Sequence, residues 1–246
     1  MSTPGTLHVD LSGTTAVVTG STRGIGRAIT EGLLASGAEV IGLQRGTDSL
    51  GEGHHPLSVD LSDPVARASA ISQVLADHEV NLLVNNAGIT RRHSFEDFPL
   101  EEFSEVMAVN LDALVHLTQA FGRPMLARGG GRIVNIASMM SFFGGVQNAA
   151  YSASKGAVAQ FTRSVANDWA GRGVGVNAIA PGYIATEINT ALREDEDRNR
   201  EILGRIPAGR WGDPADLVGM VLFLASSAAD YLHGAVLPVD GGYLAR

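Results

Sequence analysis

The chain has 246 residues, 45% of them hydrophobic, and a formal net charge of −8. This length fits one large domain or two small ones and can bury a substantial core. The acidic balance argues against a nucleic-acid backbone as partner, and the lack of cysteine excludes disulfides, thiol catalysis and cysteine-ligated metals. No apolar run reaches the length of a membrane span and no export signal opens the chain, so we expect a soluble cytoplasmic protein without membrane partners.

Short apolar strands alternate with helical stretches from end to end. We predict strands at 14–19, 39–43, 57–59, 81–85, 132–136, 175–179 and 235–239. Helices are predicted at 24–36, 63–78, 100–127, 150–170, 187–204 and 213–225. No linker or repeat divides the chain, so residues 1–246 are expected to form a single α/β domain with a parallel sheet covered on both faces.

A glycine-rich turn joins the first strand to the first helix. Gly20, Gly24 and Gly26 let a pyrophosphate approach the backbone where the helix begins. Their spacing, Gly-x-x-x-Gly-x-Gly, differs from the usual dinucleotide fingerprint, and a tight structural turn is the alternative. The position between first strand and first helix favours nucleotide binding.

The second strand ends at Gln44 and Arg45, where NAD-selective sites often carry an acid. Arg45 and Arg23 are placed to flank a 2′-phosphate, which favours NADP; the alternative is that both are solvated. The stretch 46–56 reads as a surface loop in which His54 and His55 are solvated and bind no metal. Asp60 is placed to touch an adenine, or is simply a turn residue.

Polar residues follow the fourth strand and interrupt the next helix. Asn86, Ala87 and Gly88 are small enough to let the backbone lie against a cofactor. Arg91 and Arg92 come next, and such a pair can clamp a carboxylate or remain on the solvated surface. Asn110 falls within the long helix at 100–127, where an amide is either solvated or marks a local kink with a polar role.

Lys155 is the only lysine, since all other Lys and Arg positions are arginine. It follows Tyr151 by four residues, which places both on one helix face. A free tyrosine has a pKa of about 10, and a nearby cation lowers it by roughly 1–3 units. Tyr151 is therefore a candidate general acid or base. Ser138 follows a buried strand. Two unrelated residues on an amphipathic helix are the alternative for the pair alone.

These motifs occur together and in one order, and the ordered set resembles the short-chain dehydrogenase/reductase family over nearly the whole chain. The set comprises Thr19-Gly20-x-x-x-Gly24-x-Gly26, Asn85-Asn86-Ala87-Gly88, Asn110, Ser138, Tyr151-x-x-x-Lys155 and Pro181-Gly182. The resemblance implies a Rossmann-like, doubly wound sheet of seven parallel strands and hydride transfer with NAD or NADP. It further implies a homotetramer.

The resemblance assigns roles to four residues. Tyr151 is implied as general acid/base and Lys155 as its pKa-lowering, ribose-binding partner. Ser138 would hold the reacting oxygen, and Asn110 would support a water-mediated proton relay. The cofactor residues indicated by motifs and resemblance are Gly20, Thr22, Arg23, Gly24, Ile25, Gly26, Gln44, Arg45, Asp60, Leu61, Asn86, Ala87, Gly88, Tyr151, Lys155, Pro181, Gly182, Ile184 and Thr186.

Within the family, the chain is most similar to members that act on sugar acids, of the 2-dehydro-3-deoxy-D-gluconate and gluconate 5-dehydrogenase type. The candidate substrate residues are Arg91, Arg92, Ser138, Met140, Gln147 and Tyr151. The charged stretch 187–204 resembles a mobile lid, and Arg246 is a candidate to reach a neighbouring subunit. A 3-oxoacyl-thioester reductase and a non-catalytic cofactor sensor are the alternatives. No metal is expected.

Overall fold

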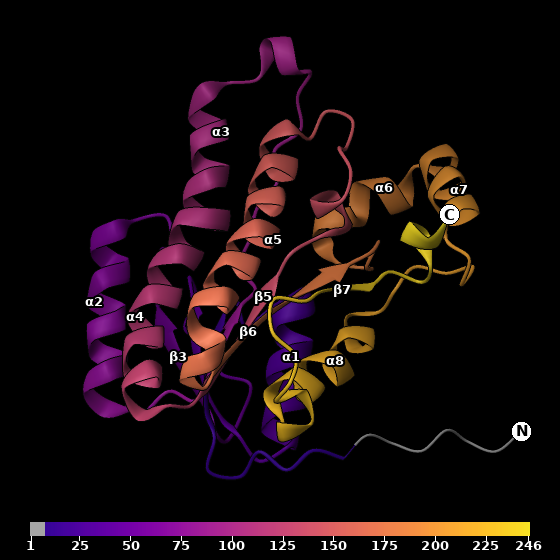
Figure 1. Ribbon diagram of the computed structural model, residues 1–246. Coiled ribbons are helices and arrows are strands. Elements are labelled where there is room, and N and C mark those ends of the chain that lie inside the picture. The colour runs from indigo at the N-terminus through magenta and orange to yellow at the C-terminus, as the bar shows by residue number, and fades with distance from the viewer. Residues whose placement is uncertain (1–7) are drawn as a thin grey trace, which may run out of the picture.

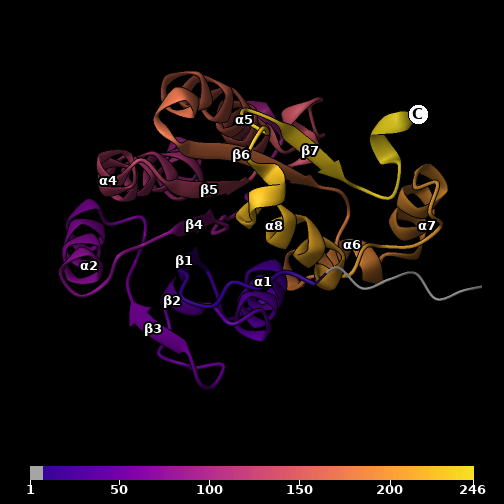
Figure 2. The same ribbon diagram turned by 60° about the horizontal axis from the view of Figure 1, so that its bottom comes forward.

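The computed structural model describes residues 8–246, and one seven-stranded sheet runs through them. All pairings are parallel, and the strand order is β3-β2-β1-β4-β5-β6-β7 in the sheet that crosses the centre of Figure 1 and whose strands are all labelled in Figure 2. The strands are β1 (Thr15–Thr19), β2 (Glu39–Gln44), β3 (His54–Ser58), β4 (Leu82–Asn85), β5 (Gly131–Ile136), β6 (Val174–Pro181) and β7 (Val236–Val239). The predicted α/β class and parallel sheet are confirmed.

Helices cover both faces of this sheet, as Figure 2 shows. Helices α1 (Gly24–Ala35) and α8 (Val218–Ala225) pack on one face around Ile29, Leu33 and Leu224. Helices α2 (Pro64–Asp77), α4 (Ala113–Arg128) and α5 (Ala149–Trp169) pack on the other, where Phe121 and Met125 are fully buried. Helices α3 (Leu100–Met107), α6 (Thr190–Glu194) and α7 (Glu196–Arg205) complete the chain.

The predicted helix at 100–127 contains a local change of geometry. A π-helical turn at Ala108–Asp112 separates α3 from α4. Asn110 lies inside it and is buried, so the amide marks a kink and not a solvated helix position. Such turns are often found at functional sites.

Two other predicted elements differ in their bounds. The helix predicted at 187–204 is divided at Asp195, whose carboxylate caps α7 by accepting from the backbone N–H groups of Asp197 and Arg198. The third strand begins at His54, three residues earlier than predicted, because it pairs with β2 from Val40 onward.

The prediction that His54 is solvated is wrong. Pairing with β2 buries the ring, and its Nδ1 accepts a hydrogen bond of 3.0 Å from the Leu50 backbone N–H. Burial lowers the pKa of His54, which favours the neutral ring. His55, which points the other way along the strand, is exposed as predicted.

The chain changes direction across the sheet between β1 and β4, which are neighbours in the sheet and distant in sequence. In doubly wound folds, ligands bind at the carboxyl ends of the strands beside such a switch point. The Thr19 hydroxyl joins the two strand ends there, since its Oγ1 accepts from the backbone N–H groups of Asn86 at 2.9 Å and Ala87 at 2.8 Å.

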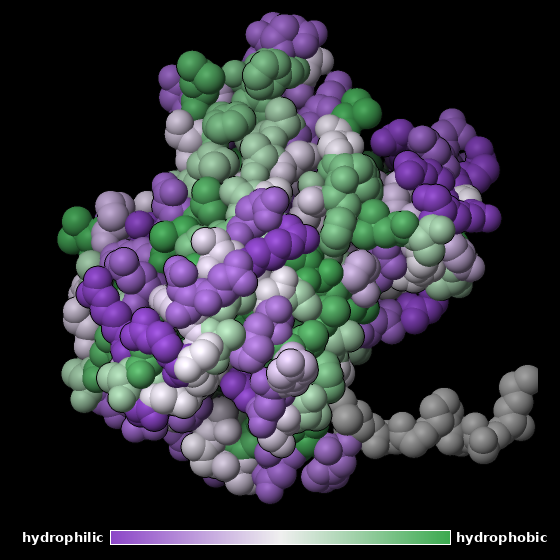
Figure 3. Space-filling model, viewed as in Figure 1, coloured by the Kyte–Doolittle hydropathy of each residue, from purple (hydrophilic) through white to green (hydrophobic). Residues whose placement is uncertain are grey.

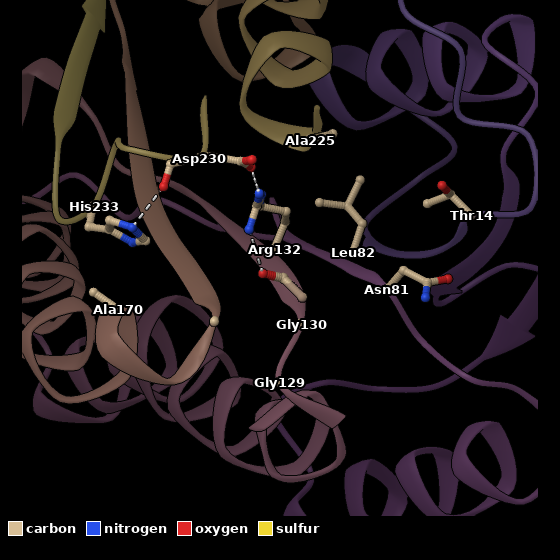
Figure 4. Close-up of a pocket in the computed structure, with 12 residues that line it drawn as sticks. Thr14, Asn81, Leu82, Gly129, Gly130, Arg132, Ala170, Ala225, Asp230 and His233 are labelled. Carbon is tan, nitrogen blue, oxygen red and sulfur yellow. Dashed lines mark hydrogen bonds and ion pairs between the residues drawn. The ribbon is translucent and has the colours of Figure 1, made fainter. Parts of the chain in front are cut away.

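A cleft of about 460 Å³ lies at the opposite, amino-terminal edge of the sheet (Figure 4). Arg132 forms an ion pair with Asp230 there, although the Arg132 Nε and the His233 Nδ1 are buried without a hydrogen-bond partner within residues 8–246. The His233 ring contacts the Asp230 backbone carbonyl oxygen at 3.1 Å. This cleft ties β5 to the segment before β7 and is remote from the switch point, so it is not the candidate site.

Gly26 provides a test of the turn after β1. A Cβ added there would collide with the Gly20 carbonyl oxygen and the Asn86 side-chain amide. We predict that Gly26→Ala lowers the free energy of unfolding by about 1–3 kcal/mol, the usual cost of overpacking. Thermal or urea unfolding measures it.

The matched control is Gly219→Ala, in the exposed part of α8, where an added Cβ meets nothing within 4 Å. Alanine there should stabilise the protein by about 0.5–1 kcal/mol, because glycine is a poor helix former. Equal stability of Gly26→Ala and the parent protein would contradict the packing of this turn.

Candidate active site

The predicted catalytic residues converge at the carboxyl ends of β4 and β5. Tyr151 and Lys155 lie on α5, Ser138 lies two residues after the end of β5, and Asn110 comes from the π-helical turn. The Lys155 Nζ lies 5.7 Å from the centroid of the Tyr151 ring, which confirms that the two share one helix face.

Lys155 is a buried cation. Its side chain is 3% exposed, and its Nζ donates a hydrogen bond of 2.6 Å to the Ile136 carbonyl oxygen at the end of β5. Burial lowers the pKa of Lys155 to about 8, because desolvation disfavours the ammonium form. Its carbonyl contact holds the ammonium beneath the neighbouring phenol.

Tyr151 does not have the lowered pKa that the sequence predicts. Desolvation of its phenol raises the pKa, and the hydrogen bond to Ser138 and the charge of Arg92 oppose this only in part. The Lys155 ammonium bonds to the Ile136 carbonyl oxygen. Burial therefore has the larger effect on the phenol.

Ser138 lies at the start of a 3-10 turn, Met139–Ser141, and is 7% exposed. Its Oγ accepts from the Met140 backbone N–H at 3.1 Å. The Ser141 hydroxyl donates to the Lys155 carbonyl oxygen at 2.6 Å, which fastens this loop to α5. The serine and the Tyr151–Lys155 pair are thus held in one rigid unit.

Asn110 connects the π-helical turn to the loop after β4. Its Oδ1 accepts from the Ile89 backbone N–H at 2.8 Å, and its Nδ2 donates to the Ile89 carbonyl oxygen at 3.0 Å. The same amide donates to the Ser154 hydroxyl at 3.0 Å. A Cβ built on Gly88 would lie 3.4 Å from Asn110 Oδ1 and 3.6 Å from Lys155 Nζ, so all three residues border one space.

Ser154 is a site residue that the sequence prediction missed. It is fully buried, and its hydroxyl donates to the Tyr151 carbonyl oxygen at 2.8 Å while accepting from Asn110. Its signal in the sequence was a small polar residue on the buried side of α5, immediately before Lys155.

The glycine-rich turn faces the segment after β6. Gly20 and Gly24 have φ of 67° and 50°, values that favour glycine. The Thr186 methyl lies 3.2 Å from where a Gly24 Cβ would stand. Pro181, Gly182 and Ile184 lead to Thr186, and Ile184 is buried. Two predicted cofactor segments therefore meet.

Cations and acids border the same turn. Arg23 pairs with Glu187 at 3.1 Å, and both side chains are exposed. Arg45 is exposed at the end of β2, and its charge helps to lower the pKa of Asp60, after the larger effect of the Ser62 hydroxyl. Leu61 beside it is buried.

Gln44, which the sequence analysis names as a cofactor residue, is buried. Only 4% of it is accessible, because its Oε1 accepts from the buried Ser21 hydroxyl and its Nε2 donates to the Asp48 carbonyl oxygen at 2.9 Å. Both ends of the amide are thus satisfied inside the protein, and no acid of β2 faces the turn.

Arg91 and Arg92 occupy different environments. Arg91 pairs with Glu105 at 2.9 Å and with Glu102 at 3.6 Å, which ties it to α3. Arg92 is exposed, makes no ion pair within residues 8–246, and acts electrostatically on the Tyr151 phenol. Of the two arginines predicted to bind a carboxylate, only Arg92 therefore has a guanidinium without an acidic partner within residues 8–246.

The remaining candidate substrate residues, Gln147 and Met140, lie in the segment between β5 and α5. Gln147 is exposed, has a φ of 55°, and its carbonyl oxygen accepts from the His93 backbone N–H at 3.2 Å. Met140 is partly buried in the turn after Ser138. Arg246 donates to the Gly204 carbonyl oxygen of its own chain at 3.1 Å, and its reach towards a neighbouring subunit stays a prediction.

Residues 8–246 contain neither a metal-binding cluster of side chains nor a membrane-spanning helix. No group of three or more His, Asp or Glu side chains is arranged to hold a metal ion there. Over the same residues, no helix is long and apolar enough to cross a membrane.

Comparison with known proteins identifies relatives along the whole chain. A family model described as enoyl-(acyl carrier protein) reductase matches residues 20–244. The 2-dehydro-3-deoxy-D-gluconate 5-dehydrogenase of Bacillus subtilis (strain 168) is 48% identical, over 98% of this chain and 100% of the relative.

Two solved structures extend this similarity to the fold. A protein from Beutenbergia cavernae, provisionally assigned as an NAD(P)-dependent gluconate 5-dehydrogenase and holding NADP at low occupancy, is 49% identical with a TM-score of 0.91, over 96% of this chain and 99% of that one. A provisionally assigned 2-deoxy-D-gluconate 3-dehydrogenase from Agrobacterium tumefaciens with bound NADP is 47% identical with a TM-score of 0.90, over 96% and 98%.

The buried ammonium predicts a pH-dependent stability. Its pKa falls from 10.5 to about 8 on folding, so between these values the unfolded chain binds a proton that the folded chain lacks, and stability rises with pH. We predict that the ligand-free protein gains about 2 kcal/mol relative to Lys155→Met between pH 7 and about pH 9.5.

Thermal unfolding of both proteins across this range measures the difference, and all other titrating groups cancel. A constant difference, or one that falls as pH rises, would show that Lys155 is not desolvated.

Proposed function

The chain belongs to the short-chain dehydrogenase/reductase family, and we propose that it transfers a hydride between a nicotinamide cofactor and a hydroxyl or ketone of a sugar acid. The substrate is of the 2-dehydro-3-deoxy-D-gluconate or gluconate type. The observation that carries the proposal is the Tyr151 ring 5.7 Å from the Lys155 ammonium, with a phenol whose pKa is raised by burial and lowered in part by the Ser138 hydroxyl and the Arg92 charge. An acid–base group and a carboxylate ligand are thus combined in one site.

Tyr151 is the proposed general acid/base. In oxidation, its phenolate removes the proton of the substrate hydroxyl while the hydride on the same carbon leaves; in reduction, the phenol returns a proton to the oxygen. When bound, the cofactor supplies the hydride acceptor or donor, and in its oxidised form a positive charge. That charge is of the kind needed to offset the burial that raises the pKa of Tyr151.

Ser138 and Lys155 orient this proton transfer. The Ser138 hydroxyl bonds to the phenol and is placed to hold the reacting oxygen of the substrate. Lys155 has three N–H donors, and Ile136 takes one of them. The others remain for ribose hydroxyls and for a water held near Asn110, from which a proton reaches solvent.

NADP is the proposed cofactor. The glycine turn, with Gly20, Gly24 and Gly26, would hold the pyrophosphate, and Thr186 the nicotinamide amide. Arg23 and Arg45 would bind the 2′-phosphate, while the internally bonded Gln44 offers nothing that resembles the acid of NAD-selective sites. The phosphate would replace Glu187 as the partner of Arg23, an exchange of low cost because exposed ion pairs contribute little.

Arg92 is the proposed carboxylate ligand, since its guanidinium is exposed beside the phenol and can bind a carboxylate through two parallel hydrogen bonds. Arg91 supports the loop through its glutamate partners on α3. Met140 and Gln147 would border the substrate.

Two other functions use the same residues. A 3-oxoacyl-thioester reductase shares the acid–base group, but it would need a basic surface for an acidic carrier, and the net charge of this chain is −8. A non-catalytic cofactor sensor would not require Ser138, Tyr151 and Lys155 together. Neither function explains the exposed guanidinium of Arg92 as well as a small acidic substrate would.

A cytoplasmic homotetramer is proposed for the assembled enzyme. Apolar residues gather over the upper parts of α3 and α5 in Figure 3. Val115 on α4 is 37% exposed, and Phe142 and Val146, just before α5, are 47% and 84% exposed. A subunit interface on this side would cover them.

A substrate panel tests the activity. Purified protein is mixed with NAD⁺ or NADP⁺ and with sugar acids, neutral sugars or a 3-hydroxyacyl thioester, and nicotinamide absorbance is followed. We predict turnover with sugar acids and faster turnover with NADP⁺. Tyr151→Phe should lose at least about a hundredfold in kcat while cofactor binding persists.

Turnover of the thioester alone would move the protein to acyl chemistry. Cofactor binding without turnover of any substrate would favour the sensor. Retained activity of Tyr151→Phe would remove the proposed acid/base.

The two adjacent arginines make a matched pair for testing carboxylate recognition. Arg92→Ala should raise KM for sugar acids by roughly tenfold to a hundredfold, the value of a charged hydrogen bond, and leave KM for neutral sugars nearly unchanged. Arg91→Ala should have a smaller effect that does not discriminate between acidic and neutral substrates. Equal effects on both substrate classes for Arg92→Ala would exclude the carboxylate contact.

A further inference from the structure

Tyr243, in the turn after β7, is buried at a junction of three segments. Its ring stacks on Phe143 with centroids 5.9 Å apart and an interplanar angle of 22°. Tyr183 packs against it edge-on at 5.4 Å, and the Arg205 guanidinium carbon lies 4.4 Å from the ring centroid. Only 4% of Tyr243 is exposed.

Each neighbour belongs to a different part of the site. Phe143 follows the short turn that Ser138 begins, and Tyr183 lies between Gly182 and Ile184 in the proposed nicotinamide segment. Arg205 is the last residue of α7, in the stretch predicted to be a lid. One aromatic ring thus contacts the serine loop, the cofactor segment and the lid helix.

The turn that carries Tyr243 is itself fixed. The Asp240 carboxylate accepts from the backbone N–H groups of Gly242 at 2.9 Å and Leu244 at 2.8 Å. The Ala208 N–H donates to the Gly241 carbonyl oxygen at 3.0 Å. The ring is therefore presented by a bonded turn, not by a free chain end.

Apolar contacts join the same segments on the inner side. Ile202 and Ile206, in and just after α7, are buried in one cluster with Tyr243 and Met139. Met139 directly follows Ser138. The position of α7 is thereby transmitted to the residue next to the proposed oxygen-binding serine.

We propose that Tyr243 is a positioning residue on which α7 docks, so that docking of α7 sets the place of the Ser138 loop. The role of Ser138 in this inference rests on the proposed function; the docking does not. The Arg205 side chain is exposed, so its contact with the ring can be released without opening the apolar cluster. An exposed cation–π contact of this kind changes an equilibrium by about two- to fivefold.

Limited trypsin digestion reports docking without any substrate, because α6 and α7 contain arginines. Cleavage after Arg193 and Arg198 is followed by mass spectrometry in the full chain, with and without NADP⁺. The variants are Tyr243→Leu, which removes the aromatic face, Tyr243→Phe, which keeps it, and Arg205→Gln. Arg200→Gln is the matched control, since Arg200 lies on α7 and pairs only with Asp197 within residues 8–246.

We expect Tyr243→Leu and Arg205→Gln to be cleaved about two- to fivefold faster at these two sites, and Tyr243→Phe and Arg200→Gln to match the parent protein. The double variant Tyr243→Leu/Arg205→Gln should be no faster than Tyr243→Leu, because both remove one contact. In turnover, Tyr243→Leu should lower kcat and raise KM for the sugar acid, with cofactor affinity unchanged and Tyr243→Phe restoring both.

Additive effects in the double variant, or unchanged cleavage in Tyr243→Leu, would overturn the proposal. Faster cleavage throughout the chain would overturn it too, since that indicates global unfolding. If Tyr243→Leu does not fold, the cleavage rate of Arg205→Gln is compared with that of Arg200→Gln, and equal rates would overturn the proposal. Altered cleavage with no turnover of sugar acids in the parent protein would leave the docking intact and remove only the proposed function.

Discussion

The structure depends on the burial of one ammonium group at the end of β5. Lys155 Nζ bonds to the Ile136 carbonyl oxygen at 2.6 Å, and no acid within residues 8–246 pairs with it. A buried cation without a carboxylate is costly, and folding of the sheet and α5 must offset that cost. The same arrangement leaves a positive charge whose remaining donors face the phenol and the space beside Gly88. A carboxylate partner would stabilise the fold and remove this capacity.

A buried set of amides and hydroxyls supports the strand ends beneath that charge. Asn85 donates to the Asn135 Oδ1 at 2.9 Å and to the Thr118 hydroxyl at 3.1 Å, and Asn135 donates to the Thr162 hydroxyl at 3.0 Å. These bonds join β4, β5, α4 and α5. These bonds restrict how the Tyr151 helix can move relative to the loop after β4, although the Asn85 Oδ1 is buried without a hydrogen-bond partner within residues 8–246.

Residue spacing was enough to predict the features that follow a regular pattern along the chain. Alternating strands and helices indicated the sheet, and the separation of Tyr151 and Lys155 indicated a shared helix face. Side-chain partners distant in sequence could not be predicted that way. The bond from Ser21 holds the side chain of Gln44, a predicted cofactor residue, inside the protein. The ion pair of Arg91 with Glu105 on α3 gives Arg91 a different environment from Arg92. The burial of His54 follows from strand register, which periodicity does not specify. The raised pKa of Tyr151 reflects desolvation, a property of the assembled site.

The segment that begins at Thr186 contacts the glycine turn, so a ligand at this turn would affect the position of the segment. Thr186 packs on Gly24, and Glu187 pairs with Arg23. A phosphate bound at Arg23 must displace Glu187, which is the first residue of the segment leading to α6 and α7. The segment then has two arrangements, one with the Arg23–Glu187 pair and one without it. A phosphate ligand shifts the equilibrium between them only as far as its affinities for the two arrangements differ. Because the pair is exposed and weak, the shift is small in energy. It acts at one end of the segment, while the contact of Arg205 with Tyr243 holds the other end. Because the two contacts share no residue, we expect them to contribute independently to the position of the segment.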